Sequence, residues 1–489
     1  MTQKTKEEKK QPFGEETEPF DWTEHGVPAP EWAELVAGLP KEGKTAMLPD
    51  KPARELQAEE NAKRHEKSER NFDAMGLAGE VNVEEVEMHT LGDGAQDRLT
   101  ARVYTRAPRP DDLYMEKVPG VVYYHGGGYA FGAPDTEAYL CSLVASRLRV
   151  VVVYVCYREA PQHPYPAAHN DGKEGFEWVV DNAKRLGIDP EQIVLVGLSC
   201  GAGITASTAL RVCNEDAERL RAEADRVQGE AERRTDEDGS PQPAKRRRRT
   251  SKDESSNNSI QSWRDTVLEA TEVKSSDGVP PEAKVYDRCA PLAGRKDQKA
   301  RIKGMLLAVP WLMQESSFPF DKFTSREATS RVQCAEAAGM SKPVYDRLAE
   351  WLGAKDPNDR LLNVPLAKDE ELARFPRTAL IVSGMDFFRD DGLLFGHKLK
   401  SLGVPRRLHL FKGMPHGFRK HDDLWSSKRL DELLLLLINW ALDRTVSSVD
   451  TKAHIEQREL ANPPDQMSQV SRMQEPPFST RYSGTKETM

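Results

Sequence analysis

The chain has 489 residues, of which 38% are hydrophobic and 30% are charged. Its 15 Phe, 12 Tyr and 8 Trp can build a sizeable core, which excludes a wholly disordered chain. Asp and Glu outnumber Lys and Arg by 79 to 70, and the formal net charge is -9, so we expect no nucleic-acid binding by the molecule as a whole.

The pattern of apolar residues predicts strands and helices that alternate along the chain. After a short amphipathic helix at 28–39, eight strand-like segments occur at 81–89, 99–105, 118–124, 150–155, 192–196, 303–309, 378–383 and 407–411. Helical patterns, such as 171–186 and 392–402, separate most of the later strands. This alternation favours an open, largely parallel sheet covered on both faces. The first two strands are joined too briefly for a crossover, so we expect an antiparallel edge.

Three segments are too polar to belong to this core. We predict a flexible tail at 1–25, a largely disordered insertion at 214–299 whose start at 214–234 forms a solvated helix, and a disordered tail at 447–489. The insertion contains the basic cluster Lys245, Arg246, Arg247, Arg248 and Arg249. With Arg233 and Arg234 before it, this cluster fits a bipartite nuclear-localisation signal that an import receptor would bind. The other interpretation is a basic tract in a flexible loop that serves no import.

The sequence favours an intracellular protein, cytoplasmic, nuclear or both. The start at 1–10 is charged and lacks the apolar stretch of a signal peptide. The longest aliphatic run, 433–438, is far shorter than the roughly 20 residues of a membrane-spanning helix. The six cysteines are scattered without metal-ligand spacing, which suits free thiols in a reducing compartment.

A candidate nucleophile lies between the strand 193–196 and a helical pattern at 202–212, in the sequence Gly-Leu-Ser-Cys-Gly at 197–201. This is the context of a nucleophile elbow, a sharp turn that exposes Ser199 and leaves no room for a Cβ two positions before or after it. Alone, the motif also fits an ordinary glycine-rich turn. Cys200 lacks a glycine two residues before it, so we expect it to offer its backbone N–H rather than to be the nucleophile.

A second glycine-rich loop, His-Gly-Gly-Gly at 125–128, follows the strand 121–124. A loop whose N–H groups approach a substrate oxyanion needs residues without side chains, and this pattern is expected after the third strand of esterases and lipases. Taken by itself, the pattern favours an ordinary glycine-rich turn. We expect His125 to hold the loop and not to act as the general base.

A serine nucleophile needs a base, and the base needs an orienting acid; in this arrangement the acid precedes the histidine in the chain. Asp386 follows the strand 380–383, and His416 follows the strand 409–411. Both lie beyond strand ends, where open α/β sheets build their sites. The rivals are Asp390 and Asp391, which we expect to cap the next helix, His409 within a strand, and His421 in a charged, exposed segment.

At this point the chain resembles the hormone-sensitive-lipase-like family of α/β-hydrolases, which includes arylacetamide deacetylases and microbial carboxylesterases. The resemblance rests on five motifs in order: 125–128, Tyr-Arg-Glu-Ala-Pro-Gln-His-Pro-Tyr-Pro-Ala-Ala at 157–168, 197–201, Gly-Met-Asp-Phe-Phe-Arg-Asp-Asp-Gly at 384–392, and His-Gly-Phe at 416–418. They cover about 81–442 apart from the insertion. The chain departs from the family at Leu198 and Cys200, where the family commonly has Asp or Thr and then Ala, and at Glu159 and His169, where leucine is frequent. The side chain at position 200 should matter little if only its N–H is used.

The resemblance implies an α/β-hydrolase fold with an eight-stranded, mostly parallel sheet and a helical cap. The catalytic core would comprise 77–213 and 300–446, and the cap would be built from 26–76 and about 320–366. It implies Ser199 as nucleophile, His416 as base and Asp386 as orienting acid, with Gly126, Gly127 and Cys200 as oxyanion-hole donors. No metal or organic cofactor is expected.

The function that these features indicate is a serine hydrolase that cleaves carboxylic esters of small, partly apolar molecules through an acyl-enzyme. The sequence does not separate esters from amides or lactones. The alternative is a non-catalytic binding or scaffold protein, in the nucleus, that keeps the fold. The polar insertion and the basic cluster keep this alternative open, but His416 and the other site residues favour catalysis.

Overall fold

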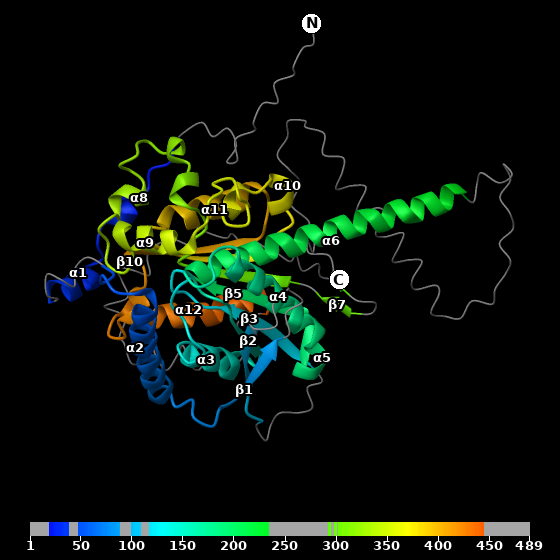
Figure 1. Ribbon diagram of the computed structural model, residues 1–489, viewed down its shortest axis with the longest axis horizontal. Coiled ribbons are helices and arrows are strands. Elements are labelled where there is room, and N and C mark those ends of the chain that lie inside the picture. Colours follow the sequence, from blue (N-terminus) through cyan, green and yellow to red (C-terminus); the bar gives the residue numbers. More distant parts are fainter. Residues whose placement is uncertain are drawn as a thin grey trace, which may run out of the picture.

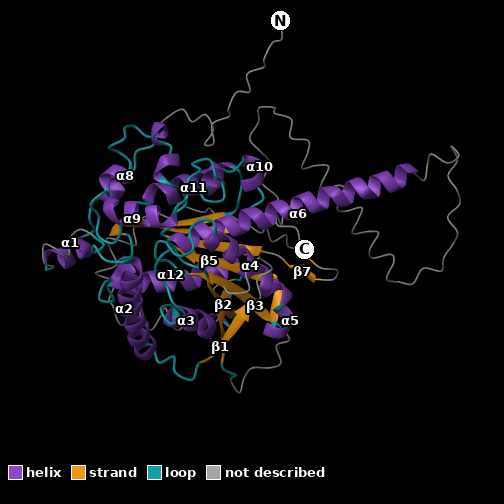
Figure 2. Ribbon diagram, viewed as in Figure 1, coloured by secondary structure: helices purple, strands orange, loops and turns teal. Residues whose placement is uncertain are grey.

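The computed structural model describes residues 19–38, 47–88, 99–108, 117–233, 292–294, 298–300 and 302–444. Its centre is an eight-stranded sheet with the order β1-β2-β4-β3-β5-β8-β9-β10 (Figures 1 and 2). The strands are β1 Val81–Met88, β2 Leu99–Arg106, β3 Val118–Tyr124, β4 Val151–Cys156, β5 Ile188–Leu198, β8 Ile302–Ala308, β9 Arg377–Met385 and β10 Arg406–Pro415. All eight predicted strands are therefore confirmed.

The directions of the strands confirm a mostly parallel sheet with an antiparallel edge. β2 runs antiparallel to both of its neighbours, β1 and β4. The other neighbouring pairs of this sheet, from β4 through to β10, are parallel. The carboxyl ends of β3, β5, β9 and β10 thus lie at one edge, where loops from distant parts of the sequence can meet.

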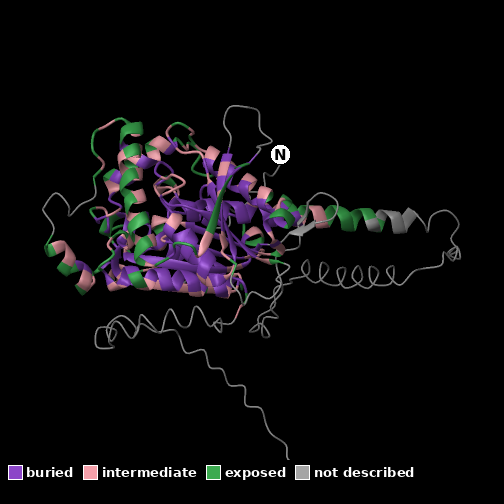
Figure 3. Cartoon of the chain, turned by 90° about the horizontal axis from the view of Figure 1, so that it is seen from below, coloured by how far each residue is buried: buried purple, intermediate pink, exposed green. Residues whose placement is uncertain are grey.

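Helices cover both faces of the sheet, as the alternating pattern predicted (Figure 2). One face packs against α4 Ala167–Asp181, α6 Cys200–Arg233 and α11 Arg389–Ser401, and the other packs against α3 Ala138–Leu148 and α12 Trp425–Ala441. Adjacent strand residues face opposite layers: Val122 belongs to the first cluster and Val121 to the second. Both faces of the central strands are buried (Figure 3), and the buried stretches, such as 151–155 in β4 and 193–196 in β5, are accordingly apolar throughout.

Further elements precede the first strand and separate β8 from β9. Before the first strand come the 3-10 turn Thr23–Gly26, α1 Pro30–Ala37 and α2 Ala53–Ala74. Between β8 and β9 come α8 Ser330–Gln333, α9 Lys342–Leu352 and α10 Asp369–Leu372, with short 3-10 turns at Glu315–Ser317, Phe320–Lys322 and Val364–Leu366. Two short elements remain: α5 Ala183–Leu186 lies before β5, and the 3-10 turn Phe418–Lys420 lies between β10 and α12.

Two boundaries differ from the sequence interpretation. The flexible tail predicted at 1–25 is wrong from Phe20 onward: its ring stacks on Trp22, and its N–H donates to the carbonyl of Lys322. The solvated helix predicted from residue 214 is not a separate element, because α6 runs without a break from Cys200 to Arg233. It projects from the body of the molecule as a single rod (Figure 1).

The insertion lies mostly outside the described residues, and so does the basic cluster at 245–249. Its end holds two short strands that the sequence pattern did not predict, β6 Leu292–Gly294 and β7 Gln298–Ala300, which pair antiparallel. The predicted tail at 447–489 lies outside the described residues as well.

Candidate active site

Ser199 sits at a sharp turn between β5 and α6, with a backbone φ of 53°. The flanking glycines leave no room for side chains: a Cβ on Gly197 would lie 2.1 Å from the carbonyl oxygen of Gly201, and one on Gly201 would lie 2.2 Å from that of Tyr124. Both neighbours are backbone oxygens, which cannot move aside for a side chain as a flexible side chain could. The geometry is therefore that of the nucleophile elbow that the spacing predicted.

Ser199, His416 and Asp386 form one hydrogen-bonded chain. Ser199 Oγ lies 2.9 Å from His416 Nε2, and His416 Nδ1 lies 2.8 Å from Asp386 Oδ2. The other oxygen of Asp386, Oδ1, accepts a hydrogen bond of 2.9 Å from the Phe388 N–H. The exposed fractions of the three residues are 6%, 7% and 1%. The structure thus brings together the three residues that the sequence singled out, although they are far apart in the chain.

Asp390 and Asp391 do not take part in this chain, and the prediction that they cap α11 is wrong. The N-cap of α11 is Phe388, without a side-chain cap. Asp390 pairs with Arg389 and accepts from the Ser330 N–H. Asp391 pairs with Arg331 at 2.6 Å and accepts from the N–H groups of Leu312 and Met313. Both carboxylates instead attach α11 to the segment between β8 and β9.

The rival histidines also lie outside the chain. His409 belongs to β10. His421 is half-buried, and its ring contacts Trp32 edge-on, so the exposed position expected for it is wrong. His125 is buried with its ring stacked on Tyr157, and its Nδ1 lies 2.9 Å from the carbonyl oxygen of Gly126. Burial lowers the pKa of His125 to about 3, so this ring stays neutral and holds the loop.

The loop after β3 lies directly against the elbow. A Cβ added to Gly126 would come within 3.1 Å of Ser199 Cβ. Gly127 has a φ of +134°, a conformation that favours glycine. Cys200 is the first residue of α6, where a backbone N–H has no partner inside the helix. Gly126 and Gly127 line the same cavity as Ser199, and Cys200 directly follows Ser199 in the chain.

The side chain of Cys200 matters more than its expected role suggested. Its Sγ accepts a hydrogen bond of 3.1 Å from the N–H of Tyr129 and lies 3.5 Å from the Tyr157 hydroxyl. Tyr129 has a φ of 64°, which is uncommon for a residue with a side chain. The thiol thus ties the start of α6 to the loop after β3. Burial raises the pKa of this thiol, which keeps it protonated and unreactive.

A cavity of about 560 Å³ opens onto Ser199 and His416. Its apolar wall combines the segment before β1 with α9 and the loop after β3, and includes Met47, Leu48, Leu56, Phe131, Met340, Val344 and Leu348. Its polar wall comes largely from α2 and the turn after His416, and it carries both charges, with Glu59, Glu60, Lys63, Arg64, Lys67 and Lys420. The cavity size and its mixed lining suit a small, partly apolar molecule.

The sequence interpretation missed two arginines near this site, one buried and one partly buried. Arg331 is fully buried and contacts the rings of Phe318 and Phe387 as well as Asp391. Arg64, on α2, pairs with Glu137 at 2.9 Å. Neither arginine lies in one of the sequence motifs. Each is an isolated arginine in a segment that the family resemblance assigned to the cap, and nothing else in the sequence indicated its role.

Among the residues that the structure describes, no group of His, Cys, Asp and Glu is arranged to hold a metal ion. None of the described helices is long and apolar enough to cross a membrane.

Comparisons with known proteins agree with this geometry. A family model described as the α/β hydrolase fold matches residues 121–271 and 288–420, more than half of the chain. Carboxylesterase NlhH from Mycobacterium tuberculosis (strain CDC 1551 / Oshkosh) is 41% identical over 134 residues, which are 27% of this chain and 39% of that protein. The match thus spans well under half the length of this relative. Esterase LipI from Mycobacterium tuberculosis (strain ATCC 25618 / H37Rv) is 24% identical over 327 residues, or 67% of this chain and 72% of that one.

Solved structures show the same architecture. Esterase LipW from Mycobacterium marinum aligns with a TM-score of 0.55 and 23% identity, over 85% of this chain and 98% of that chain. A vibralactone cyclase aligns with a TM-score of 0.62 and 18% identity, over 87% and 98%. At sequence identities this low, the two structural matches show a shared fold alone.

Proposed function

Since the chain belongs to the hormone-sensitive-lipase-like family of α/β-hydrolases, we propose that it is a serine esterase that cleaves carboxylic esters of small, partly apolar molecules. The observation that carries the proposal is the hydrogen-bonded chain from Ser199 through His416 to Asp386, which opens onto the cavity. The names of carboxylesterase NlhH and esterase LipI support the same chemistry.

The reaction that this arrangement supports is acyl transfer in two steps. Ser199 Oγ attacks the ester carbonyl carbon while its proton passes to His416 Nε2, and Asp386 stabilises the imidazolium through Nδ1–H. The C–O bond to the alcohol breaks, and His416 returns the proton to the leaving alcohol. A water molecule then attacks the acyl-enzyme, with His416 taking its proton, and the acid leaves as Ser199 is restored.

In both steps the carbonyl oxygen becomes negatively charged. The N–H groups of Gly126, Gly127 and Cys200 are the donors proposed to hold it, because Gly126 packs against Ser199, Gly127 lines the same cavity and Cys200 begins the helix directly after Ser199. Loss of one such donor costs about 100- to 1000-fold in rate in related chemistry.

The substrate class follows from the cavity. The segments 26–76 and 320–366, which we propose as the cap, contribute Leu56 and Lys63 on one side and Val344 and Leu348 on the other. A volume of about 560 Å³ accommodates a small molecule, and the apolar wall suits a short acyl chain. Amides and lactones would use the same residues.

The experiment that tests this proposal is hydrolysis of p-nitrophenyl esters from acetate to decanoate by the wild type and by Ser199→Ala. We expect turnover of short chains by the wild type and a loss of at least about 10⁴-fold in Ser199→Ala. Ser207→Ala, a buried serine on the same helix, is the matched control and should retain activity. If a folded wild type cleaves none of the esters and a fluorophosphonate does not label Ser199, a binding protein with this fold replaces the esterase.

The cellular location is a separate proposal that rests on the sequence. We propose an intracellular protein whose cluster at 245–249 binds an import receptor. Replacing its five basic residues by alanine in a fluorescently tagged full chain should move the protein from nucleus to cytoplasm. An unchanged distribution would show that the tract serves no import.

A further inference from the structure

Helix α2 lies beside the active site without the apolar face that normally docks a helix. Of its 22 residues only Leu56 and Ser68 are buried. Four polar residues instead form a stripe along one side: Gln57, Asn61, Arg64 and Ser68. They are spaced four, three and four residues apart, and residues with this spacing lie on one face of a helix. We call these four residues the α2 stripe.

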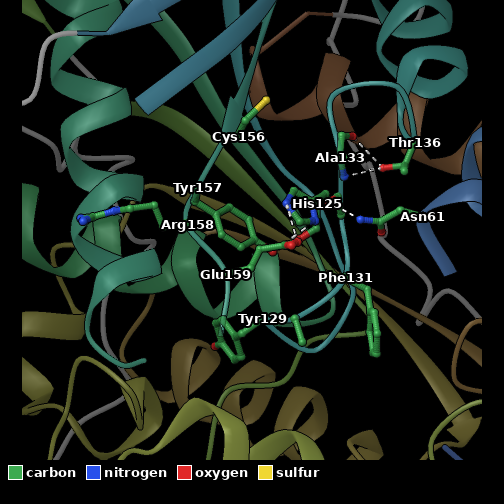
Figure 4. A network of polar contacts seen from close by, with 12 residues as sticks. Asn61, His125, Tyr129, Phe131, Ala133, Thr136, Cys156, Tyr157, Arg158 and Glu159 are labelled. Atoms are coloured by element: carbon green, nitrogen blue, oxygen red, sulfur yellow. Dashed lines mark hydrogen bonds and ion pairs between the residues drawn. The ribbon is translucent and has the colours of Figure 1, made fainter. Parts of the chain in front are cut away.

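The first two members of the α2 stripe donate to backbone carbonyls of the loop after β3. Gln57 Nε2 donates to the carbonyl of Ala130 at 2.9 Å, and also to that of Ala160 at 3.1 Å. Asn61 Nδ2 donates to the carbonyl of Gly132 at 2.8 Å, and Figure 4 shows this amide reaching the loop beside Phe131 and Ala133. The carbonyls of Ala130 and Gly132 lie a few residues beyond the proposed oxyanion-hole glycines.

Arg64 reaches those glycines themselves. Its Nη2 donates to the carbonyl of Gly126 at 2.9 Å, and its Nη1 donates to that of Phe131. Glu137 pairs with the same guanidinium and in turn accepts from the Tyr123 hydroxyl at 2.9 Å, so the group has a fixed position. A Cβ on Gly127 would lie 2.8 Å from Arg64 Nη1. The arginine therefore packs directly against the glycine loop.

The last member of the α2 stripe connects the helix to α3. Ser68 is buried, and its Oγ accepts a hydrogen bond of 3.0 Å from the N–H of Tyr139. The stripe thus contacts the loop after β3 at several points and continues to the helix that follows it.

The carbonyl of Gly126 matters because of the peptide unit to which it belongs. A trans peptide is planar, with its C=O and N–H pointing in opposite directions. Arg64 and the His125 ring both contact the carbonyl oxygen of Gly126, so the N–H of Gly127, in the same unit, points away from them. The N–H of Gly127 is one of the proposed oxyanion donors. Its direction is set by the groups that bind the Gly126 carbonyl at the other side of the same peptide unit.

We propose that the α2 stripe is a clamp that positions the oxyanion hole, with Arg64 as its main positioning residue. The proposal rests on the esterase function proposed above and adds to it a part outside the family match at 121–420. Because α2 also lines the cavity with Leu56, Lys63 and Lys67, the helix that contacts the substrate is the one that orients the oxyanion donors.

The test compares Arg64→Met with Arg70→Met, an arginine of the same helix whose side chain is 62% exposed and pairs with Glu66 on the helix surface. For the ester that the wild type prefers, Arg64→Met should lower kcat about 10- to 100-fold and change KM less than threefold, since the donors act mainly on the transition state. Arg64→Lys, which keeps the charge but not the fork, should recover part of the loss. Arg70→Met should match the wild type.

A second readout separates positioning from a general loss of structure. The inhibition constant of a trifluoromethyl ketone, which forms an oxyanion on Ser199, should rise in Arg64→Met by about the factor by which kcat falls. Hydrogen exchange of the amides at 126–132 should become faster in Arg64→Met and stay unchanged in Arg70→Met.

The outcomes can be told apart. A wild type without esterase activity overturns the proposed function, and hydrogen exchange then decides the clamp alone. An active wild type with an equally active Arg64→Met, or with unchanged exchange in the loop, overturns the clamp. If Arg64→Met does not fold, Asn61→Ala, which leaves the Arg64–Glu137 pair in place, must lower kcat by about threefold or more for the clamp to stand.

Discussion

The loops that carry Ser199, Asp386 and His416 extend directly from β5, β9 and β10, whereas the loop that carries Gly126 and Gly127 is held on its outer side by side chains of α2. The first three loops inherit their positions from neighbouring parallel strands, as in the pairing of Val382 with Leu410. The glycine loop also follows a strand, but its outer part accepts hydrogen bonds from a helix in which only Leu56 and Ser68 are buried.

This difference concerns how easily each half of the site can change. Burial of a large apolar side chain contributes about 1.5–3 kcal/mol, and the strands around the triad bury many of them. A single hydrogen bond contributes about 0.5–1.5 kcal/mol net. We call the loops that carry Ser199, Asp386 and His416 the triad side of the site, and the loop that carries Gly126 and Gly127 the oxyanion side. We therefore expect the triad side to be rigid and the oxyanion side to respond to changes in α2.

The largest effect is expected on the triad side. Asp386→Asn keeps the shape of the side chain but no longer favours the tautomer that leaves His416 Nε2 free to accept the serine proton. We expect kcat for ester hydrolysis to fall about 10⁴-fold with unchanged folding, as judged by circular dichroism. Asp423→Asn, at an exposed position near His416 in the sequence, is the control. A variant with more than a tenth of the wild-type kcat would show that Asp386 does not orient the base.

The next effect is on the stability of the triad side. Arg331→Met leaves Asp391 buried without its charge partner, which costs about 3–5 kcal/mol in related pairs. Urea unfolding should show this decrease in the free energy of unfolding. The double variant Arg331→Met with Asp391→Leu removes the orphaned charge as well and should recover part of the loss. A double variant as unstable as the single one would mean that the pair itself is not the cause.

The smallest effect is on the oxyanion side and depends on pH. Burial raises the pKa of Glu159 from 4.5 to about 8, although Arg64 opposes the shift, and the carboxylate lies 4.0 Å from His125 (Figure 4). Between pH 4.5 and 8, Glu159 therefore keeps its proton in the folded state but has lost it in the unfolded state. The contribution of Glu159 to stability is fully present below pH 4.5 and is lost as the pH rises through 8.

Glu159→Gln removes this titration. We expect the variant to be about 1–3 kcal/mol more stable than the wild type at pH 9 and nearly equal to it at pH 5, measured by thermal unfolding across that range. Because other groups titrate equally in both proteins, the difference between them isolates Glu159. Parallel stability curves for the two proteins would contradict the raised pKa.

The sheet could be predicted from the sequence, and so could the meeting of Ser199, Asp386 and His416, because both leave regular signals. Continuous apolar runs mark strands that are buried on both faces, and the glycines at 197 and 201 mark a turn without room for a Cβ. The positions of Asp386 and His416 follow from strand ends that meet at one edge of the sheet.

What the sequence did not predict are contacts of polar side chains with distant backbone. The α2 stripe has helical spacing but no apolar period, so a search for amphipathic helices overlooks it. Asp390 and Asp391 look like helix caps because a cap is a local contact, whereas their partners Ser330 and Arg331 come from another segment. The role of the Cys200 thiol depends on Tyr129, which lies in a loop far away in the sequence.

The continuous helix α6 has a consequence for how this chain could vary over time. It begins next to Ser199 and continues into the insertion as far as Arg233, and its 34 residues at about 1.5 Å each span roughly 50 Å. The part of the insertion beyond the far end of this helix can lengthen, shorten or change in composition without crowding Ser199. The helix therefore acts as a spacer between two parts of the chain that can evolve at separate rates.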